Sequence, residues 1–156
     1  MTTAPGSDGW PSAVKRVEIS RPLLAASGEL TTAALARIAA QHPWFAELDA
    51  ENRSWISLVA KSGIDGFLTW FASGGERLSP GNVFDAAPRA LTRQITLNQT
   101  VDLVSTTIDT VEDRIDTLPE ADQGVLRIGI LRYSREVAFA AARVYARAAE
   151  SRGAWD

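Results

Sequence analysis

Two long stretches with a regular apolar pattern, joined at Pro119, constrain the fold of this chain more than any other feature. Apolar side chains recur in alternating steps of four and three residues in the first stretch: Leu97, Val101, Val104, Ile108, Val111, Ile115 and Leu118. The second stretch has nearly the same spacing: Leu126, Ile130, Tyr133, Val137, Ala140, Val144 and Ala148. Such spacing is typical of helices that pack along their length. Because Pro119 interrupts the helix, the two are predicted to form an antiparallel hairpin.

The two predicted helices carry opposite charges. Acidic residues dominate the first helix and the link, at Asp102, Asp109, Glu112, Asp113, Asp116, Glu120 and Asp122, whereas arginine dominates the second, at Arg127, Arg132, Arg135, Arg143, Arg147 and Arg152. Exposed ion pairs contribute only a few tenths of a kcal/mol each, so they set register more than stability. Because each helix has a continuous apolar face and the charges of the two are opposite, we interpret them as two core helices of one bundle.

A compatible interpretation is that one seam of the last helix also pairs with a second copy of the chain. Small alanine side chains along this helix permit close approach of another helix. The residues predicted to form a homodimer interface are Tyr133, Val137, Ala141, Val144 and Ala148.

The first half of the chain is also predicted to be mainly helical. Val14–Leu24 is ambiguous, since VEIS could form a short strand or dock on the body. Residues 30–41 form a helix that Thr31 or Thr32 can cap and that ends at His42-Pro43. Pro43 then opens a short helix.

A longer helix follows the short one. Asp49 is predicted to cap it and Gly74-Gly75 to stop it. Gly63 and Gly66 weaken this helix but allow another backbone to approach.

The segments on either side of the first heptad-patterned helix complete the prediction. Residues 82–87 form a turn or short helix, and Pro88 begins a helical pattern that is kinked near Thr96–Asn98. The last helix starts near Glu120–Asp122 and is terminated by Gly153. The fold class is therefore all-α, with about five to seven helices.

Composition sets further bounds. A chain of 156 residues suits one domain with its own core, here residues 14–156. Residues 1–13 are small and polar and are expected to be a disordered tail. A net charge of -3 argues against an intrinsic nucleic-acid surface. No apolar run approaches about 18 residues, so no membrane span is expected. With no cysteine in the chain, a cytoplasmic location is the natural expectation.

Residues that could carry chemistry are scarce. His42 is the only histidine and cysteine is absent, so no metal site of ordinary composition is predicted. There is no nucleophile elbow, dinucleotide-binding glycine motif or P-loop. No catalytic residue and no cofactor is therefore predicted, and the chain is not expected to be an enzyme. His42 as a haem ligand stays open as a less favoured alternative.

A dense aromatic set in the long central helix has two interpretations. These side chains can fill the core, or they can line a cavity for a small apolar effector between helices. The predicted pocket residues are Trp55, Val59, Phe67, Trp70 and Phe71.

Three stretches resemble a known family: PWFAELDAENRSWISLVAKSGIDGFLTWF, VFDAAPRALTRQITLNQTVDLVSTTIDTVEDRID and LRYSREVAFAAARVYARAAESRGAWD. They look like the N-terminal domain of PucR/CdaR-type bacterial transcription regulators, in particular those encoded beside fatty-acid synthesis genes. That domain is similar to the RsbR N-terminal domain, which has a globin-like helical fold without haem and dimerises. The resemblance covers roughly residues 33–156.

The resemblance implies a signal-sensing and dimerisation domain of a helix-turn-helix regulator. In such regulators DNA is bound by C-terminal domains, which this chain is expected to lack. The resemblance implies a globin-like bundle, no catalytic residues and a homodimer. A ligand-free scaffolding domain of the stressosome type is the alternative that the same resemblance allows.

Overall fold

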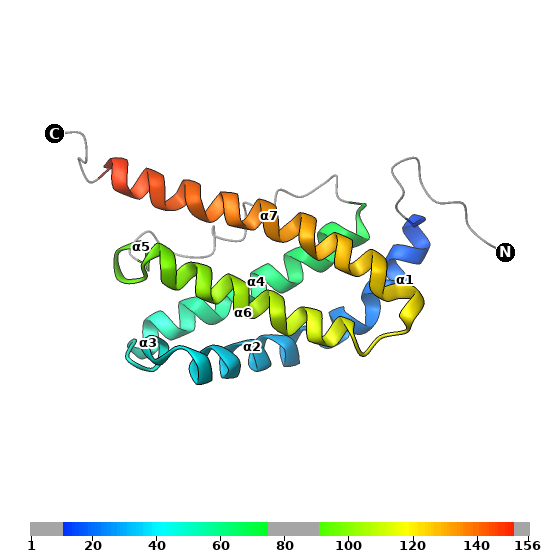
Figure 1. Ribbon diagram of the computed structural model, residues 1–156, viewed down its shortest axis with the longest axis horizontal. Coiled ribbons are helices and arrows are strands. Elements are labelled where there is room, and N and C mark those ends of the chain that lie inside the picture. The colour runs from blue at the N-terminus through cyan, green and yellow to red at the C-terminus, as the bar shows by residue number, and fades with distance from the viewer. Residues whose placement is uncertain (1–10, 75–90, 152–156) are drawn as a thin grey trace.

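The computed structural model describes residues 11–74 and 91–151, and within these ranges all the regular structure is helical (Figure 1). The helices are α1 (Ala13–Ala25), α2 (Ser27–Gln41), α3 (Pro43–Ala46), α4 (Ala50–Ala72), α5 (Leu91–Gln94), α6 (Leu97–Ile115) and α7 (Glu120–Ser151). The predicted all-α class is therefore confirmed. The globin-like character implied by the resemblance stays a prediction.

The helices form a bundle in which α4, α6 and α7 run side by side. In Figure 1, α6 and α7 run antiparallel as a hairpin. The link between Ile115 and Glu120 contains Pro119, as predicted. The most extensive helix contacts are those of α6 with α7, of α2 with α6 and α4, and of α1 with α4. The two long C-terminal helices therefore belong to the body of the bundle.

Helix α1 corrects one prediction. The VEIS stretch is helical throughout, so the strand alternative is wrong. The side chain of Ser12 caps the helix by accepting a hydrogen bond from the Lys15 backbone N–H at 3.3 Å. Residues 1–10 of the predicted tail lie outside the described residues, whereas Ala13 already begins α1.

Helix α2 begins earlier than its predicted start. Thr31 and Thr32 are not caps, because their hydroxyls donate to the carbonyls of Ser27 and Gly28 one turn earlier, at 2.9 and 3.1 Å. Threonine makes such bonds to a preceding carbonyl inside helices. The predicted end of the helix at His42 is confirmed.

Both ends of α4 follow the prediction. The Asp49 carboxylate accepts a hydrogen bond from the Asn52 N–H at 2.8 Å and so caps the helix. Gly74 has a positive φ of 85°, a backbone conformation that glycine adopts without steric cost. The chain therefore leaves the helix at this point.

The kink predicted near Thr96–Asn98 is a helix end followed by a new helix start. The Thr96 hydroxyl accepts from the Gln99 N–H at 3.1 Å, and the Gln99 side chain accepts from the Thr96 N–H at 2.9 Å. This reciprocal pair is a capping box. The predicted turn at 82–87, the helix start at Pro88 and the terminator Gly153 lie outside the described residues.

Among the described residues, two groups of buried apolar side chains hold the bundle together. The larger includes Leu23 of α1, Phe67 and Phe71 of α4, Ile115 of α6 and Leu126 of α7, each at most 1% exposed. The smaller lies where α2, α3, α4 and the link between α5 and α6 meet, around Ile38, Phe45, Ile56 and Ile95.

The acidic residues of α6 pair with two helices. Asp116 forms an ion pair with Arg127 of α7, as the charge pattern predicts. Asp113, however, pairs with Arg37 of α2 at 2.8 Å, and Arg114 lies 3.6 Å from Glu29 of α2. The charges of α6 therefore hold α2 as well as α7 in register.

Within residues 11–74 and within residues 91–151, no single helix is both long and apolar enough to cross a membrane. In these ranges only α1 and α2 taken together, with a 55° bend between them, reach that length and apolarity.

Candidate functional site

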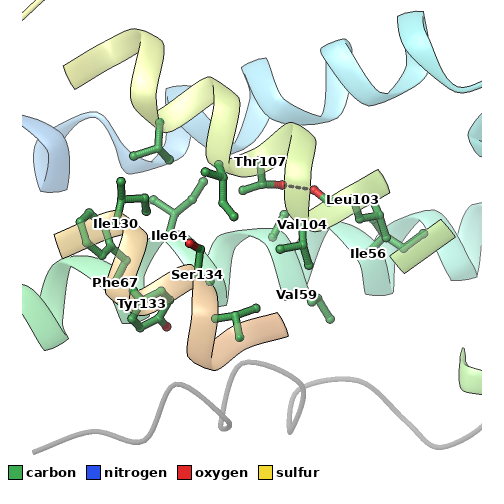
Figure 2. Close-up of a pocket in the computed structure, with 15 residues that line it drawn as sticks. Ile56, Val59, Ile64, Phe67, Leu103, Val104, Thr107, Ile130, Tyr133 and Ser134 are labelled. Atoms are coloured by element: carbon green, nitrogen blue, oxygen red, sulfur yellow. Dashed lines mark hydrogen bonds between the residues drawn. The ribbon is translucent and has the colours of Figure 1, made fainter. Parts of the chain in front are cut away.

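A small cavity lies between α4, α6 and α7. Its volume is about 70 Å³. Figure 2 shows side chains from the three helices converging on it. The lining residues are Ile56, Val59, Ala60, Gly63, Ile64 and Phe67 of α4, Leu103, Val104, Thr107, Ile108 and Val111 of α6, and Ile130, Tyr133, Ser134 and Val137 of α7.

The lining of the cavity is almost entirely apolar. The Thr107 hydroxyl donates to the Leu103 carbonyl at 2.8 Å, as the dashed line in Figure 2 marks. The Ser134 hydroxyl donates to the Leu131 carbonyl at 3.1 Å. Since both hydroxyls donate within their own helices, the cavity offers little to a polar ligand. An apolar lining of this kind suits apolar atoms or small apolar molecules better than polar ligands.

Tyr133 provides the third hydroxyl of the lining. Its ring packs edge-on against Phe67, with centroids 5.6 Å apart, and lies the same distance from Trp70. Burial raises the pKa of Tyr133 to about 12, so its phenol is neutral in the physiological range. The phenol therefore adds no charge to the cavity wall.

Two of the five predicted pocket residues line the cavity, and the other three pack in the core groups. Val59 and Phe67 line the cavity. Trp70 and Phe71 are buried in the larger core group and do not line it, and Trp55 packs on the smaller group near Ile56. The aromatic set is thus mostly core, and the role of Val59 and Phe67 in binding stays a prediction.

Sequence reasoning missed the walls that α6 and α7 contribute. Val104, Ile108 and Val111 of α6, and Val137 of α7, line the cavity and occupy the heptad positions. The signal was therefore present in the sequence. A heptad pattern predicts helix packing, but nothing in a periodic pattern shows where that packing is incomplete.

The five residues predicted to form a homodimer interface lie on the face of α7 that packs into the bundle. Tyr133, Val137 and Ala141 are 5%, 6% and 4% exposed, and Val144 and Ala148 are half-buried. Most of this seam is therefore already used within one chain. The exposed apolar residues of α7, such as Leu131 at 65%, lie on another face. Dimerisation through the seam stays a prediction.

His42 lies away from the cavity. Its Nε2 atom is 3.3 Å from the Thr106 hydroxyl, and its Nδ1 atom is 3.6 Å from the Asp102 carboxylate. The Trp44 indole donates to the same carboxylate at 3.3 Å. This polar group joins the end of α2 to α6. In the part of the chain that the structure describes, no three His, Cys, Asp or Glu side chains are grouped so as to hold a metal ion.

The comparisons with known proteins find relatives but no family. No family model matches the chain. It is similar to uncharacterized proteins of Mycobacterium bovis and of two Mycobacterium tuberculosis strains, each 38% identical over 133 residues. The match covers 83% of this chain but only 32% of each relative. The chain thus spans about a third of the length of the curated relatives that it matches.

Proposed function

We propose that this chain is a regulatory module of a longer protein: the signal-sensing and dimerisation domain of a cytoplasmic helix-turn-helix transcription regulator. The length of the mycobacterial relatives supports the modular part of this proposal, since two thirds of each lies outside the matched region. The resemblance to PucR/CdaR-type regulators supplies the transcriptional part, together with the link to lipid or fatty-acid metabolism genes. DNA binding would belong to other domains of such a protein.

The observation that carries the sensing part is the apolar cavity between α4, α6 and α7. Protein interiors are close-packed and contain few voids larger than a water molecule, so this space is a departure from ordinary core packing. Its volume of about 70 Å³ sets the class of ligand. A cavity of about 150 Å³ holds benzene. The effector that fits here without rearrangement is therefore a small, uncharged, apolar molecule of a few heavy atoms, or the end of a longer apolar chain.

The position of the cavity suggests how a signal would leave it. About two turns of α7 contribute Ile130, Tyr133, Ser134 and Val137 to its wall. The same helix continues to Ser151. A ligand that binds more tightly at one separation of α4 and α7 increases the population of the conformation with that separation. Because α7 is one continuous helix, a shift of its position at the cavity also moves its C-terminal end.

A scaffolding module without a ligand is the second candidate. The small volume of the cavity and the complete burial of Phe67 and Phe71 favour it. A haem-binding globin sensor is disfavoured, because His42 bonds to Thr106 and does not line the cavity.

A nuclear magnetic resonance titration distinguishes these candidates. Backbone amide spectra of the chain would be recorded under xenon and, separately, under methane, since both probes are small enough for a cavity of about 70 Å³. We expect saturable shifts at Val59, Val104 and Val137, and further shifts along α7 toward Ser151. Shifts confined to the cavity would contradict signal transmission, and no saturable shift with either probe would favour the scaffolding candidate.

The matched control fills the cavity. The variant Ala60→Val combined with Val111→Ile adds methyl groups to two lining positions on different helices. We expect it to keep the helical circular dichroism spectrum and to lose the saturable shifts. Shifts that persist in this variant would place the probe elsewhere on the chain.

A further inference from the structure

The C-terminal part of α7 is attached to the bundle mainly through one side chain. Residues 142–151 are all described, and none of their side chains is fully buried. Among the described residues, only Tyr145 forms side-chain hydrogen bonds that join this part of α7 to another part of the fold. Figure 1 shows this part of α7 at the same end of the bundle as α5. A segment with so few buried contacts is only weakly held in place.

Tyr145 bonds to the link between α5 and α6 and to the first turns of α6. Its hydroxyl donates to the Ile95 carbonyl at 2.6 Å and lies 2.7 Å from the Thr100 hydroxyl. Burial raises the pKa of Tyr145, although the hydrogen bond with Thr100 acts in the opposite direction, so the phenol keeps its proton at neutral pH and can donate. A bond this short depends strongly on position, because lengthening it by about 1 Å takes it beyond hydrogen-bonding distance.

The link that accepts this bond is anchored by other parts of the bundle. Ile95 is 2% exposed and belongs to the smaller core group, with Ile38 and Ile56. The Asn52 side chain of α4 donates to the Gln94 side chain and so holds the link from α4 as well. Because the link is fixed on these sides, a displacement of α7 breaks the bond to its carbonyl and does not carry the link along.

The position of α7 is set at the cavity, by its contact with α4. Tyr133 lines the cavity, is 5% exposed and packs against Phe67 and Trp70, so its ring is not free to swing away. Its hydroxyl oxygen lies only 2.5 Å from the place that a Cβ atom on Gly66 would take. Tyr145 lies about 18 Å further along the same continuous helix, at about 1.5 Å per residue. A change in the separation of α4 and α7 at the cavity therefore also moves the Tyr145 hydroxyl.

We propose that Tyr145 is a latch that controls two states of the C-terminal part of α7. In the docked state the Tyr145 hydroxyl bonds to the Ile95 carbonyl, and residues 142–151 lie against the bundle. In the released state this bond is broken and the same residues leave the bundle. A wider separation of α4 and α7 at the cavity favours the released state. In one respect the latch rests on the proposed function, since an effector in the cavity would be the agent that changes this separation.

The first test widens the separation without any ligand. Gly66→Ala places a methyl group against the Tyr133 hydroxyl, and Gly124→Ala is the matched control because a Cβ there meets nothing within 4 Å. A helix end that leaves the bundle frays, so amide hydrogen exchange of residues 142–151, relative to that of α2, should rise roughly tenfold in Gly66→Ala. It should stay unchanged in the control. Gly66→Ala in a Tyr133→Phe background lacks the obstructing oxygen and should return to the original relative rate.

A second variant distinguishes a latch from a simple attachment. Tyr145→Phe alone should raise the relative exchange of residues 142–151 by a similar factor, because the bond is already lost. In this background Gly66→Ala should add nothing further. Two independent effects would instead multiply, to roughly a hundredfold. Circular dichroism spectra establish that each variant folds.

The two tyrosines of the chain separate the latch from the effector site. With isotopically labelled tyrosine, the ring resonances of Tyr133 report occupancy of the cavity and those of Tyr145 report the latch. Under xenon both should shift, and those of Tyr145 should move toward their positions in Gly66→Ala. A shift of Tyr133 alone would overturn the latch and leave the sensing module intact. Release in Gly66→Ala without any shift of Tyr133 under xenon would support the latch and remove the effector site.

Three further results would overturn the latch. The first is an unchanged relative exchange of residues 142–151 in Gly66→Ala. The second is an equal rise in Gly66→Ala and Gly124→Ala. The third is a multiplied effect when Gly66→Ala is combined with Tyr145→Phe.

Discussion

The hydroxyl of Tyr133 on α7 occupies the space in which a side chain on Gly66 of α4 would lie. A Cβ atom at Gly66 would stand 2.5 Å from the Tyr133 hydroxyl oxygen. Such a contact is far inside van der Waals distance. The distance between α4 and α7 at this point is therefore possible only because residue 66, which faces the Tyr133 phenol, is a glycine. Gly66 is predicted from the sequence to allow another backbone to approach, whereas in the structure it makes room for the Tyr133 side chain.

The first prediction tests this relationship. Gly66→Ala should destabilise the chain by roughly 1–3 kcal/mol through overpacking, despite the better helix propensity of alanine. In a Tyr133→Phe background the obstructing oxygen is absent, so the penalty should largely vanish. Urea denaturation of the two single variants and the double variant gives the coupling free energy.

Gly124→Ala is the control for this cycle. Gly124 also lies inside a helix, but a Cβ there meets nothing within 4 Å. It should stabilise the chain by up to about 1 kcal/mol. If Gly66→Ala costs the same with and without the Tyr133 hydroxyl, the contact is not what limits the approach of the helices.

The second prediction concerns alkaline pH. Burial raises the pKa of Tyr133 from 10.0 to about 12 and also raises the pKa of Tyr145. The folded chain therefore holds these protons at a pH where the unfolded chain has lost them. The resulting stabilisation is complete below the unfolded pKa and falls as pH rises from about 10 toward 12. Tyr133→Phe should show a shallower fall in the free energy of unfolding over this window. An identical pH profile for the variant would contradict the burial of a neutral phenol.

The third prediction concerns the break between α5 and α6. Thr96→Ala removes one half of the capping box and should cost about 1 kcal/mol. Thr32→Ala is the matched control, because Thr32 is an exposed threonine inside α2 whose hydroxyl bonds one turn back. Thermal denaturation of both should show a lower midpoint for the first variant only. Equal midpoints would mean that α6 starts without help from Thr96.

The fourth prediction concerns the attachment of the C-terminal half of α7. The Tyr145 hydroxyl donates to the Ile95 carbonyl at 2.6 Å and lies 2.7 Å from the Thr100 hydroxyl. Tyr145→Phe leaves the Ile95 carbonyl without this partner and should cost roughly 1–2 kcal/mol. Hydrogen exchange should then speed up in α7 beyond Val137 more than in α4. Uniform acceleration along the chain would show that Tyr145 supports the whole bundle instead of one helix end.

The sequence was sufficient for most of the helices, and the reasons are local. Asp49 and Pro119 mark helix boundaries through backbone chemistry that operates within a few residues. The heptad spacing of α6 and α7 predicts their pairing because a repeated apolar face must be buried. The start of α2 could not be located in this way, since Thr31 and Thr32 can cap a helix or bond back within one, and tertiary packing decides between these.

The site was harder to predict than the helices. The face of α7 marked by Tyr133 and Val137 is apolar whether it meets α4 and α6 or a second chain, so periodicity could not tell the two apart. The cavity depends on how completely side chains from three helices fill one space. That is a property of the assembled bundle and not of any single helix.

The central claim is that the space between α4, α6 and α7 is an accessible apolar binding site. Diffraction from crystals of the chain under xenon pressure tests it most directly. We expect one xenon atom in contact with Val59, Val104 and Val137, and we expect it to be absent in the variant that combines Ala60→Val with Val111→Ile. A cavity that stays empty under xenon, or that holds ordered water, would contradict it.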